Sequence, residues 1–224
     1  MCDDVFEWEV ELPERTAAPL GGRRPLAQVK FSSDGHDEQW SVPLAVGRSL
    51  SKKAKLGFSV GSRAELGYLV KEASFTVGKK RVEDMLNRRD YSSQELYDRL
   101  YRDGYSESSA MRLVEYAESC GYVRDSRFAD VFIRSKVSLG WGRNRIEREL
   151  ARKGIDASSI AGWPEDYLSA DDEREHAYEL ASRRRLTGKN DYQKIVRYLC
   201  SRGYSMSVAI DAAKNALDDT ETDV

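Results

Sequence analysis

Basic and acidic side chains form two blocks in the C-terminal third of the chain, and their residue types could bind a ligand. Residues 183–202 contain seven basic residues and a single acid, Asp191. Clustered Lys and Arg side chains bind phosphate and carboxylate groups, so this block indicates a nucleic-acid or an acidic-protein partner, or else a solvated helix face. The acids of the second block fit a helix start, where the helix dipole favours carboxylates, better than a metal site. They are Asp171, Asp172, Glu173 and Glu175.

Residue types that catalyse reactions do not stand in a recognisable arrangement. The glycines near residue 140 do not follow a strand as G-x-G-x-x-G, and the segment 187–190 lacks the pattern of a phosphate loop. His36 and His176 have no evident nucleophile to activate, and the Cys and His spacing of a zinc site is missing. We therefore expect a protein that is not an enzyme and that needs no metal or cofactor.

Composition indicates a folded protein of the cytoplasm. The chain has 224 residues, of which 40% are hydrophobic and 33% charged, so it can bury a real core. No apolar run reaches the roughly 18 residues of a membrane span, and the chain starts with acids rather than the basic segment of a secretory signal. Three cysteines without C-x-x-C pairing fit a reducing compartment.

A pattern of two aliphatic residues, a glycine and another apolar residue occurs three times in the chain. Two aliphatics four residues apart share a helix face, and the glycine follows at the position where helices end in a left-handed residue. Such self-similarity predicts a helical repeat array, in which neighbouring units bury one another's apolar faces. The copies are Leu96, Leu100, Gly104, Tyr105; Ile146, Leu150, Gly154, Ile155; and Ile195, Leu199, Gly203, Tyr204.

The remaining elements follow from turn residues and charge. Residues 1–25 are acidic and rich in Pro and Gly, so we expect them not to pack. Residues 27–31 and 39–46 flank an Asp-Gly turn and predict a hairpin, and a helix is expected over 64–73. The sequence thus predicts a mainly α fold of three tandem three-helix repeats in an elongated, curved array, with a small N-terminal hairpin and helix module. Its expected parts are 1–25, the module 26–76, repeats 77–124, 125–168 and 169–218, and an acidic tail 219–224.

Three stretches of the chain, taken in their order and spacing, carry a family resemblance. The chain resembles the RecX family of recombinase regulators over about residues 57–218, and most strongly over 88–155. One segment departs from the family pattern, because Gly162-Trp163-Pro164 interrupts the third helix of repeat two, which should end or kink there. The matching stretches are Tyr91-Ser-Ser-Gln-Glu-Leu96, Gly121-Tyr-Val-Arg-Asp-Ser-Arg-Phe-Ala129, and Gly140-Trp-Gly-Arg-Asn-Arg-Ile146 continued by Glu149-Leu-Ala-Arg-Lys-Gly-Ile155.

The resemblance implies a function that composition and periodicity do not show. It implies a non-enzymatic, monomeric protein that binds RecA filaments on DNA, lies along the filament groove, and limits recombinase, ATPase and coprotease activity. The residues alone leave two alternatives, which are a nucleic-acid-binding repeat protein that acts without RecA and a peptide-binding helical scaffold. The scaffold would need an apolar groove, whereas the helix faces left after core assignment are mostly charged.

Equivalent positions of the middle helices locate the expected binding surface. Arg145, Arg148 and Arg152 lie at i, i+3 and i+7, on a stripe that the helical period turns away from the aliphatic pair. We expect this stripe to point outward, as a basic surface of repeats two and three or as a solvated face. The candidate filament- or DNA-binding residues are Arg143, Arg145, Arg148, Arg152, Lys153, Arg183, Arg184, Arg185, Lys194, Arg197 and Arg202.

Overall fold

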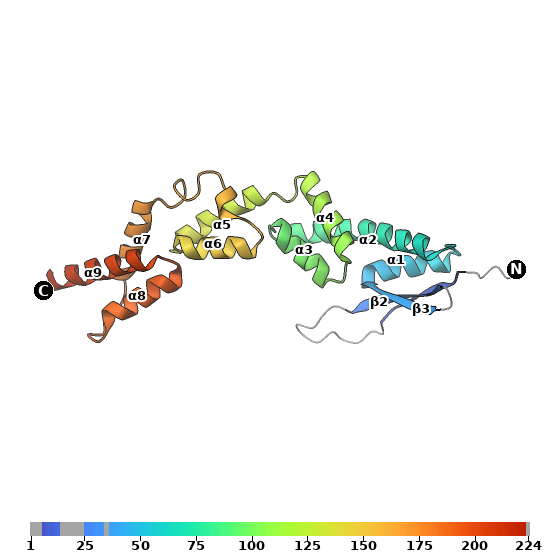
Figure 1. The fold of residues 1–224 in the computed structure, drawn as a ribbon, viewed down its shortest axis with the longest axis horizontal. Helices are drawn as coiled ribbons and strands as arrows, with labels where there is room; N and C mark the ends of the chain where they lie inside the picture. The colour runs from blue at the N-terminus through green and yellow to red at the C-terminus, as the bar shows by residue number, and fades with distance from the viewer. Residues whose placement is uncertain (1–5, 14–24, 34–35, 223–224) are drawn as a thin grey trace. The chain divides into compact units, whose positions relative to one another are not determined.

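The computed structural model describes residues 6–13, 25–33 and 36–222. These residues form a mainly α-helical protein with a small antiparallel sheet near the N-terminus, which confirms the predicted fold class (Figure 1). The chain divides into two compact units, Met1–Val123 and Arg124–Val224. The elements are β1 (Trp8–Glu11), β2 (Leu26–Ser33), β3 (His36–Pro43), α1 (Leu44–Lys55), α2 (Arg63–Leu86), α3 (Ser93–Arg102), α4 (Glu107–Ser119), α5 (Asp125–Ser138), α6 (Arg143–Arg152), the 3₁₀ helix η1 (Ala157–Ser159), α7 (Ala170–Ser182), α8 (Asp191–Arg202) and α9 (Met206–Thr222).

The predicted hairpin forms from β2 and β3. Ser33 pairs with His36 across a two-residue loop, which is the loop length that an Asp-Gly turn favours, although Asp34 and Gly35 themselves lie outside the described residues. The second strand was expected to run to Val46, but it ends at Pro43 because α1 begins at the next residue.

A third strand, β1, pairs antiparallel with the other side of β2, in the sheet order β1-β2-β3. The expectation that residues 1–25 do not pack is therefore wrong for residues 8–11. Apolar Trp8 and Val10 pack against the core, whereas Glu9 and Glu11, which alternate with them, stay exposed, so the strand needs only one apolar face. The prediction used the acidic composition of this segment and overlooked its two-residue period. Glu11 also forms a 2.7 Å ion pair with Lys30 of β2.

Two helices cover the sheet module. Helix α1, which the sequence analysis missed, packs so closely on β2 that a Cβ atom at Gly47 would lie 2.2 Å from the Cβ atom of Ala27. Helix α2 is longer than the expected 64–73 and runs without a break through residues 76 and 77. The sheet module and the first repeat therefore share one helix, and their side chains form one continuous core.

All three repeat glycines end their helices in the left-handed conformation, as the pattern predicted. The φ angles of Gly104, Gly154 and Gly203 are +96°, +74° and +99°. In each copy, the amide of the following apolar residue donates to the carbonyl of the second aliphatic, and Ile155, for example, donates to Leu150 at 3.0 Å. This is the Schellman closure of a helix end, and it explains why the glycine and the apolar residue recur together.

Gly154→Val is expected to lower the free energy of unfolding by about 1–2 kcal/mol, because a β-branched residue is strained at a φ of +74°. Thermal unfolding followed by circular dichroism measures the change. Ala151→Val is the matched control, because residue 151 lies on an exposed part of the same helix with ordinary geometry. Equal melting temperatures for the Gly154→Val variant and the natural protein would contradict this role of the glycine.

Repeat two lacks the third helix that the sequence analysis expected to be interrupted. Only the three-residue η1 forms, and turns then lead to α7. Its start is held by Asp156, which accepts hydrogen bonds from the Ser158 amide and, through its carbonyl, from the Ser159 hydroxyl. Six residues separate Asp156 from the break at Trp163, too few for a stable helix.

Candidate functional site

The basic residues expected to bind a partner lie on α6 and α8, directly after α6, and directly after α7, within the second unit. Helix α6 forms because Ile146 and Leu150 bury their side chains completely while the other positions are charged or small. Helix α8 uses Ile195 and Leu199 in the same way. The two helices belong to different repeats, so the contact between them decides which arginines remain available.

The N-terminus of α6 meets the C-terminus of α8 through backbone groups. The Gly142 amide donates to the Arg202 carbonyl at 3.0 Å, and the Asn144 amide donates to the Gly203 carbonyl at 3.1 Å. A Cβ atom at Gly142 would lie 2.5 Å from the backbone of Gly203 and Tyr204. Only glycine permits this approach, which pairs the free amides of one helix end with the free carbonyls of the other.

Glu173 of α7 completes this junction by capping α6. Its Oε1 accepts the Arg143 amide at 3.0 Å, and its Oε2 lies 3.3 Å from the Arg143 Nε. Both side chains are largely buried, and Glu165 adds a 3.6 Å contact to the guanidinium. Gly142 offers α6 no side-chain cap, so a carboxylate from the next repeat takes that place.

Tyr204 lies beside this pair and is almost fully buried. Burial raises the pKa of the Tyr204 phenol, and the nearby Glu173 carboxylate raises it further. The phenol therefore stays neutral at physiological pH. Acids at 171, 172 and 173 do occupy the first turn of α7, as predicted, but sequence reasoning missed that Glu173 turns inward to Arg143.

Arg145 does not belong to an outward stripe, so that part of the prediction is wrong. Its guanidinium lies over the Trp141 ring, 3.8 Å from the centroid, and donates to the Ser201 carbonyl at 3.4 Å. Arg202 reaches back across the junction and donates to the Leu139 carbonyl at 3.1 Å. The helical period placed Arg145 correctly on α6, but the neighbouring repeat covers that position.

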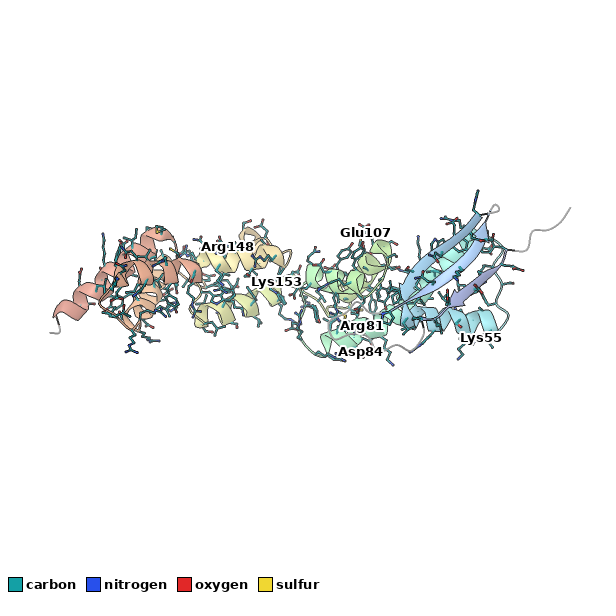
Figure 2. The ribbon with its side chains drawn as sticks, turned by 90° about the horizontal axis from the view of Figure 1, so that it is seen from below. Lys55, Arg81, Asp84, Glu107, Arg148 and Lys153 are labelled. Carbon is teal, nitrogen blue, oxygen red and sulfur yellow. The ribbon has the colours of Figure 1, made fainter. Side chains whose placement is uncertain are left out.

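The other basic residues near α6 are partly or fully exposed. Figure 2 labels two of them, Arg148 and Lys153. Arg148 is exposed and donates through Nε to the Asn144 carbonyl, without a carboxylate partner among the described residues. Arg152 forms a 2.7 Å ion pair with Glu149. Lys153 lies over the aromatic rings of α5, 5.3 Å from the centroid of Phe132.

Repeat three contributes three exposed arginines that no carboxylate neutralises within the described part of the chain, Arg184, Arg185 and Arg197. Arg184 lies over the Tyr198 ring at 4.5 Å. Two other predicted binding residues already form ion pairs within the chain, because Arg183 pairs with Glu179 and Lys194 pairs with Asp191.

The turn before α8 binds a carboxylate of its own chain. Asp191 accepts hydrogen bonds from the Thr187 hydroxyl and from the amides of Thr187 and Gly188, and these bonds lower its pKa, with the hydroxyl contributing most. A phosphate loop would offer such amides to a ligand. Here they are occupied from within, which agrees with the interpretation that segment 187–190 is no phosphate loop.

Aromatic rings between the cations form a feature that the sequence analysis did not single out. Phe128 and Phe132 stack at 6.2 Å on the half-buried side of α5, while Ala129 and Ile133 beside them enter the core. Lys136 lies 5.2 Å from the Phe132 ring and 5.1 Å from the Trp141 ring. The signal was present, because aromatics at 128 and 132 and a lysine at 136 recur every fourth residue on one helix face.

The arrangement is suited to binding a partner. Partly exposed rings and guanidinium groups suit stacking and phosphate or carboxylate contacts. The described residues hold no cluster of three or more His, Cys, Asp or Glu side chains suited to a metal ion. Among them, too, no helix combines the length and the apolar character that crossing a membrane requires.

Comparison with known sequences identifies relatives of the chain. The family model described as "RecX, second three-helix domain" matches residues 125–161. A regulatory protein RecX of Legionella pneumophila is 31% identical over 130 residues, which cover 55% of this chain and 84% of that protein. A regulatory protein RecX of Clostridioides difficile is 27% identical over 166 residues, covering 71% of this chain and 77% of the relative.

Solved structures share the fold. A crystal structure of a regulatory protein RecX aligns with a TM-score of 0.53 at 18% identity, over 89% of this chain and 94% of that one. RecX from Lactobacillus salivarius aligns with a TM-score of 0.54 at 20% identity, over 65% of this chain and 97% of that one. At this identity the likeness shows the fold alone.

Proposed function

This chain belongs to the RecX family of regulatory proteins, and from that premise we propose that it binds RecA filaments on DNA and limits their recombinase, ATPase and coprotease activity. The observation that carries the proposal is the 31% identity that extends over 84% of a regulatory protein RecX. The protein acts in the cytoplasm, as a monomer and without catalysis of its own. Its partner is the filament, with DNA as a second contact.

Three of the candidate arginines are exposed and have neither a carboxylate partner nor an aromatic ring contact within the described part of the chain, and they form the binding surface of this proposal. These are Arg148 of α6, Arg185 after α7, and Arg197 of α8. Their guanidinium groups can contact acidic side chains or phosphates without first breaking an ion pair. Arg143, Arg145 and Arg202, which the sequence analysis included, instead hold the junction between repeats two and three.

A second candidate function is nucleic-acid binding without RecA. The observation that favours it is the set of rings and lysines on α5 and after α6, where Lys136 and Lys153 both lie close to Phe132. Aromatic side chains that stack on bases, beside lysines that contact phosphates, are typical of single-strand binding. In this case the protein would limit recombination by occupying DNA.

The triple variant Arg148→Glu, Arg185→Glu, Arg197→Glu is expected to weaken inhibition of RecA ATPase by about tenfold or more, since reversing contact charges turns attraction into repulsion. Titration of the variant against RecA on single-stranded DNA measures the effect. The matched control is Lys52→Glu, Lys53→Glu, Lys55→Glu, which changes the net charge equally at exposed residues of α1. Figure 2 labels one of them, Lys55. Circular dichroism verifies that both variants remain folded.

The same variants separate the two candidate functions. If the three arginines bind single-strand phosphates directly, the affinity for DNA without RecA should fall about 20-fold between 50 and 200 mM salt, and the triple variant should remove that dependence. If they bind RecA, the variant loses inhibition while its weak DNA affinity is unchanged. Full inhibition by the folded triple variant would refute this surface.

A further inference from the structure

A groove runs between β3 and α2 in the first unit, away from the residues of the proposed filament surface in the sequence. Its volume is about 560 Å³. Trp40, Val42 and Pro43 line it from the strand, Gly67 and Val70 from the helix. The groove thus combines an apolar lining with the backbone of a strand. A ligand must therefore offer an apolar side chain and main-chain groups that can pair with the strand.

Within the part of the chain that the structure describes, β3 is an edge strand, because it pairs only with β2 in the sheet order β1-β2-β3. In a hairpin with a two-residue loop the flanking pair, here Ser33 and His36, exchanges hydrogen bonds, and bonded and non-bonded pairs then alternate. Gln39 and Ser41 are therefore non-bonded positions, whose amide and carbonyl groups point away from β2. Among the described residues no backbone group pairs with them, and both residues are exposed.

The groove has room for a side chain next to Trp40. Gly67 faces this ring, and a Cβ atom added to the glycine would make only an ordinary 3.7 Å contact with Cη2 of Trp40. Tyr68, 69% exposed, adds a second aromatic side chain at the opening. An apolar side chain inserted here would bury surface that is now in contact with water.

The charge at the opening is positive. Lys71 is exposed and has no acid within ion-pair distance in the described part of the chain. Arg63 lies over the Trp40 ring and is neutralised by Glu38, with Nη2 2.9 Å from Oε2. One uncompensated cation therefore remains, and it favours an acidic side chain on the ligand.

We propose that this groove binds an extended segment of a partner protein as a fourth strand on β3. The segment places an apolar side chain against Trp40 and an acidic side chain near Lys71. Addition of a strand to a free sheet edge beside a helix supplies main-chain hydrogen bonds for affinity and pockets for specificity. On the other side of β2 the sheet already contains a strand of this kind. It is β1, along which apolar and acidic residues alternate.

A library of linear twelve-residue peptides displayed on phage and selected on the full chain provides the probe. We expect enrichment of peptides in which apolar and acidic residues alternate. Ser41→Pro should weaken the selected peptide about tenfold or more, because it removes an outward amide and leaves the ladder to β2 intact. Ser41→Ala is the matched control, since both variants lose the hydrogen bond from the Ser41 hydroxyl to Gln28 but only proline lacks the amide.

A second pair of variants tests the apolar pocket independently. Gly67→Leu should abolish binding by filling the space beside Trp40, whereas Gly67→Ala should retain most of it. Amide exchange at Gln39 and Ser41 should slow when the peptide binds. The proposal is overturned if no peptide is enriched, if Ser41→Pro and Gly67→Leu both bind the selected peptide normally, or if the two variants alter self-association instead.

Discussion

Replacing Gly142 with alanine is expected to lower the free energy of unfolding of the second unit by about 2–3 kcal/mol. The added Cβ atom would lie 2.5 Å from the carbonyl carbon of Gly203 and the amide nitrogen of Tyr204, and backbone atoms cannot move aside as a flexible side chain can. Separating the helix ends also breaks the hydrogen bonds that the Gly142 and Asn144 amides donate to α8. The φ angle of Gly142 is −81°, so no backbone strain contributes.

Urea unfolding followed by circular dichroism, with hydrogen exchange of the Asn144 amide, measures this effect. Gly61→Ala is the matched control, because a Cβ atom there would meet only the flexible Glu65 side chain, at 3.6 Å. An unchanged unfolding midpoint for Gly142→Ala, or an Asn144 amide that exchanges as slowly as in the natural protein, would show that the helix ends are not in contact.

The repeat could be predicted from the sequence because its signals are local. A helix that ends in glycine is determined by residues within one turn, so Gly104, Gly154 and Gly203 all adopt the predicted conformation. The contact of Gly142 with Gly203 joins residues 61 positions apart, and no local pattern encodes it. Gly203 therefore both ends α8 and contacts Gly142 at the start of α6, and only the first of these roles could be predicted from the sequence.

The candidate site shows the same limit. Helical periodicity correctly placed Arg145 and Arg148 on the side of α6 away from Ile146, but it cannot tell which part of that side the next repeat covers. Arg145 turned out to pack on Trp141 and Arg148 to be exposed. A list of basic residues thus mixes those that hold the fold with those that remain available to a partner.

The prediction for the N-terminal residues was wrong because it used their acidic composition and not their alternation of apolar and acidic residues. Their acids suggested an unpacked segment, yet β1 forms because Trp8 and Val10 alternate with acids and one face suffices for an outer strand. Strand β3 ends at Pro43 instead of the expected Val46, because Pro43 is the N-cap residue of α1 and the helix begins at Leu44.

Glu173→Ala is expected to destabilise the second unit by about 3 kcal/mol. The substitution removes the main counter-ion of the largely buried Arg143 guanidinium, and it removes the cap of α6. Glu165 compensates little, since it is exposed and lies 3.6 Å away. Glu173→Gln separates the two contributions, because an amide oxygen can still accept the Arg143 amide. It should lose about half as much.

Glu175→Ala is the matched control on the same helix, because residue 175 is exposed. The double variant Arg143→Met, Glu173→Met should recover part of the loss, since neither buried charge then remains unpaired. Hydrogen exchange of α6 segments and urea unfolding measure all four variants. If Glu173→Ala unfolds at the same urea concentration as the natural protein, Arg143 is not held by the junction, and it returns to the residues available for a filament or for DNA.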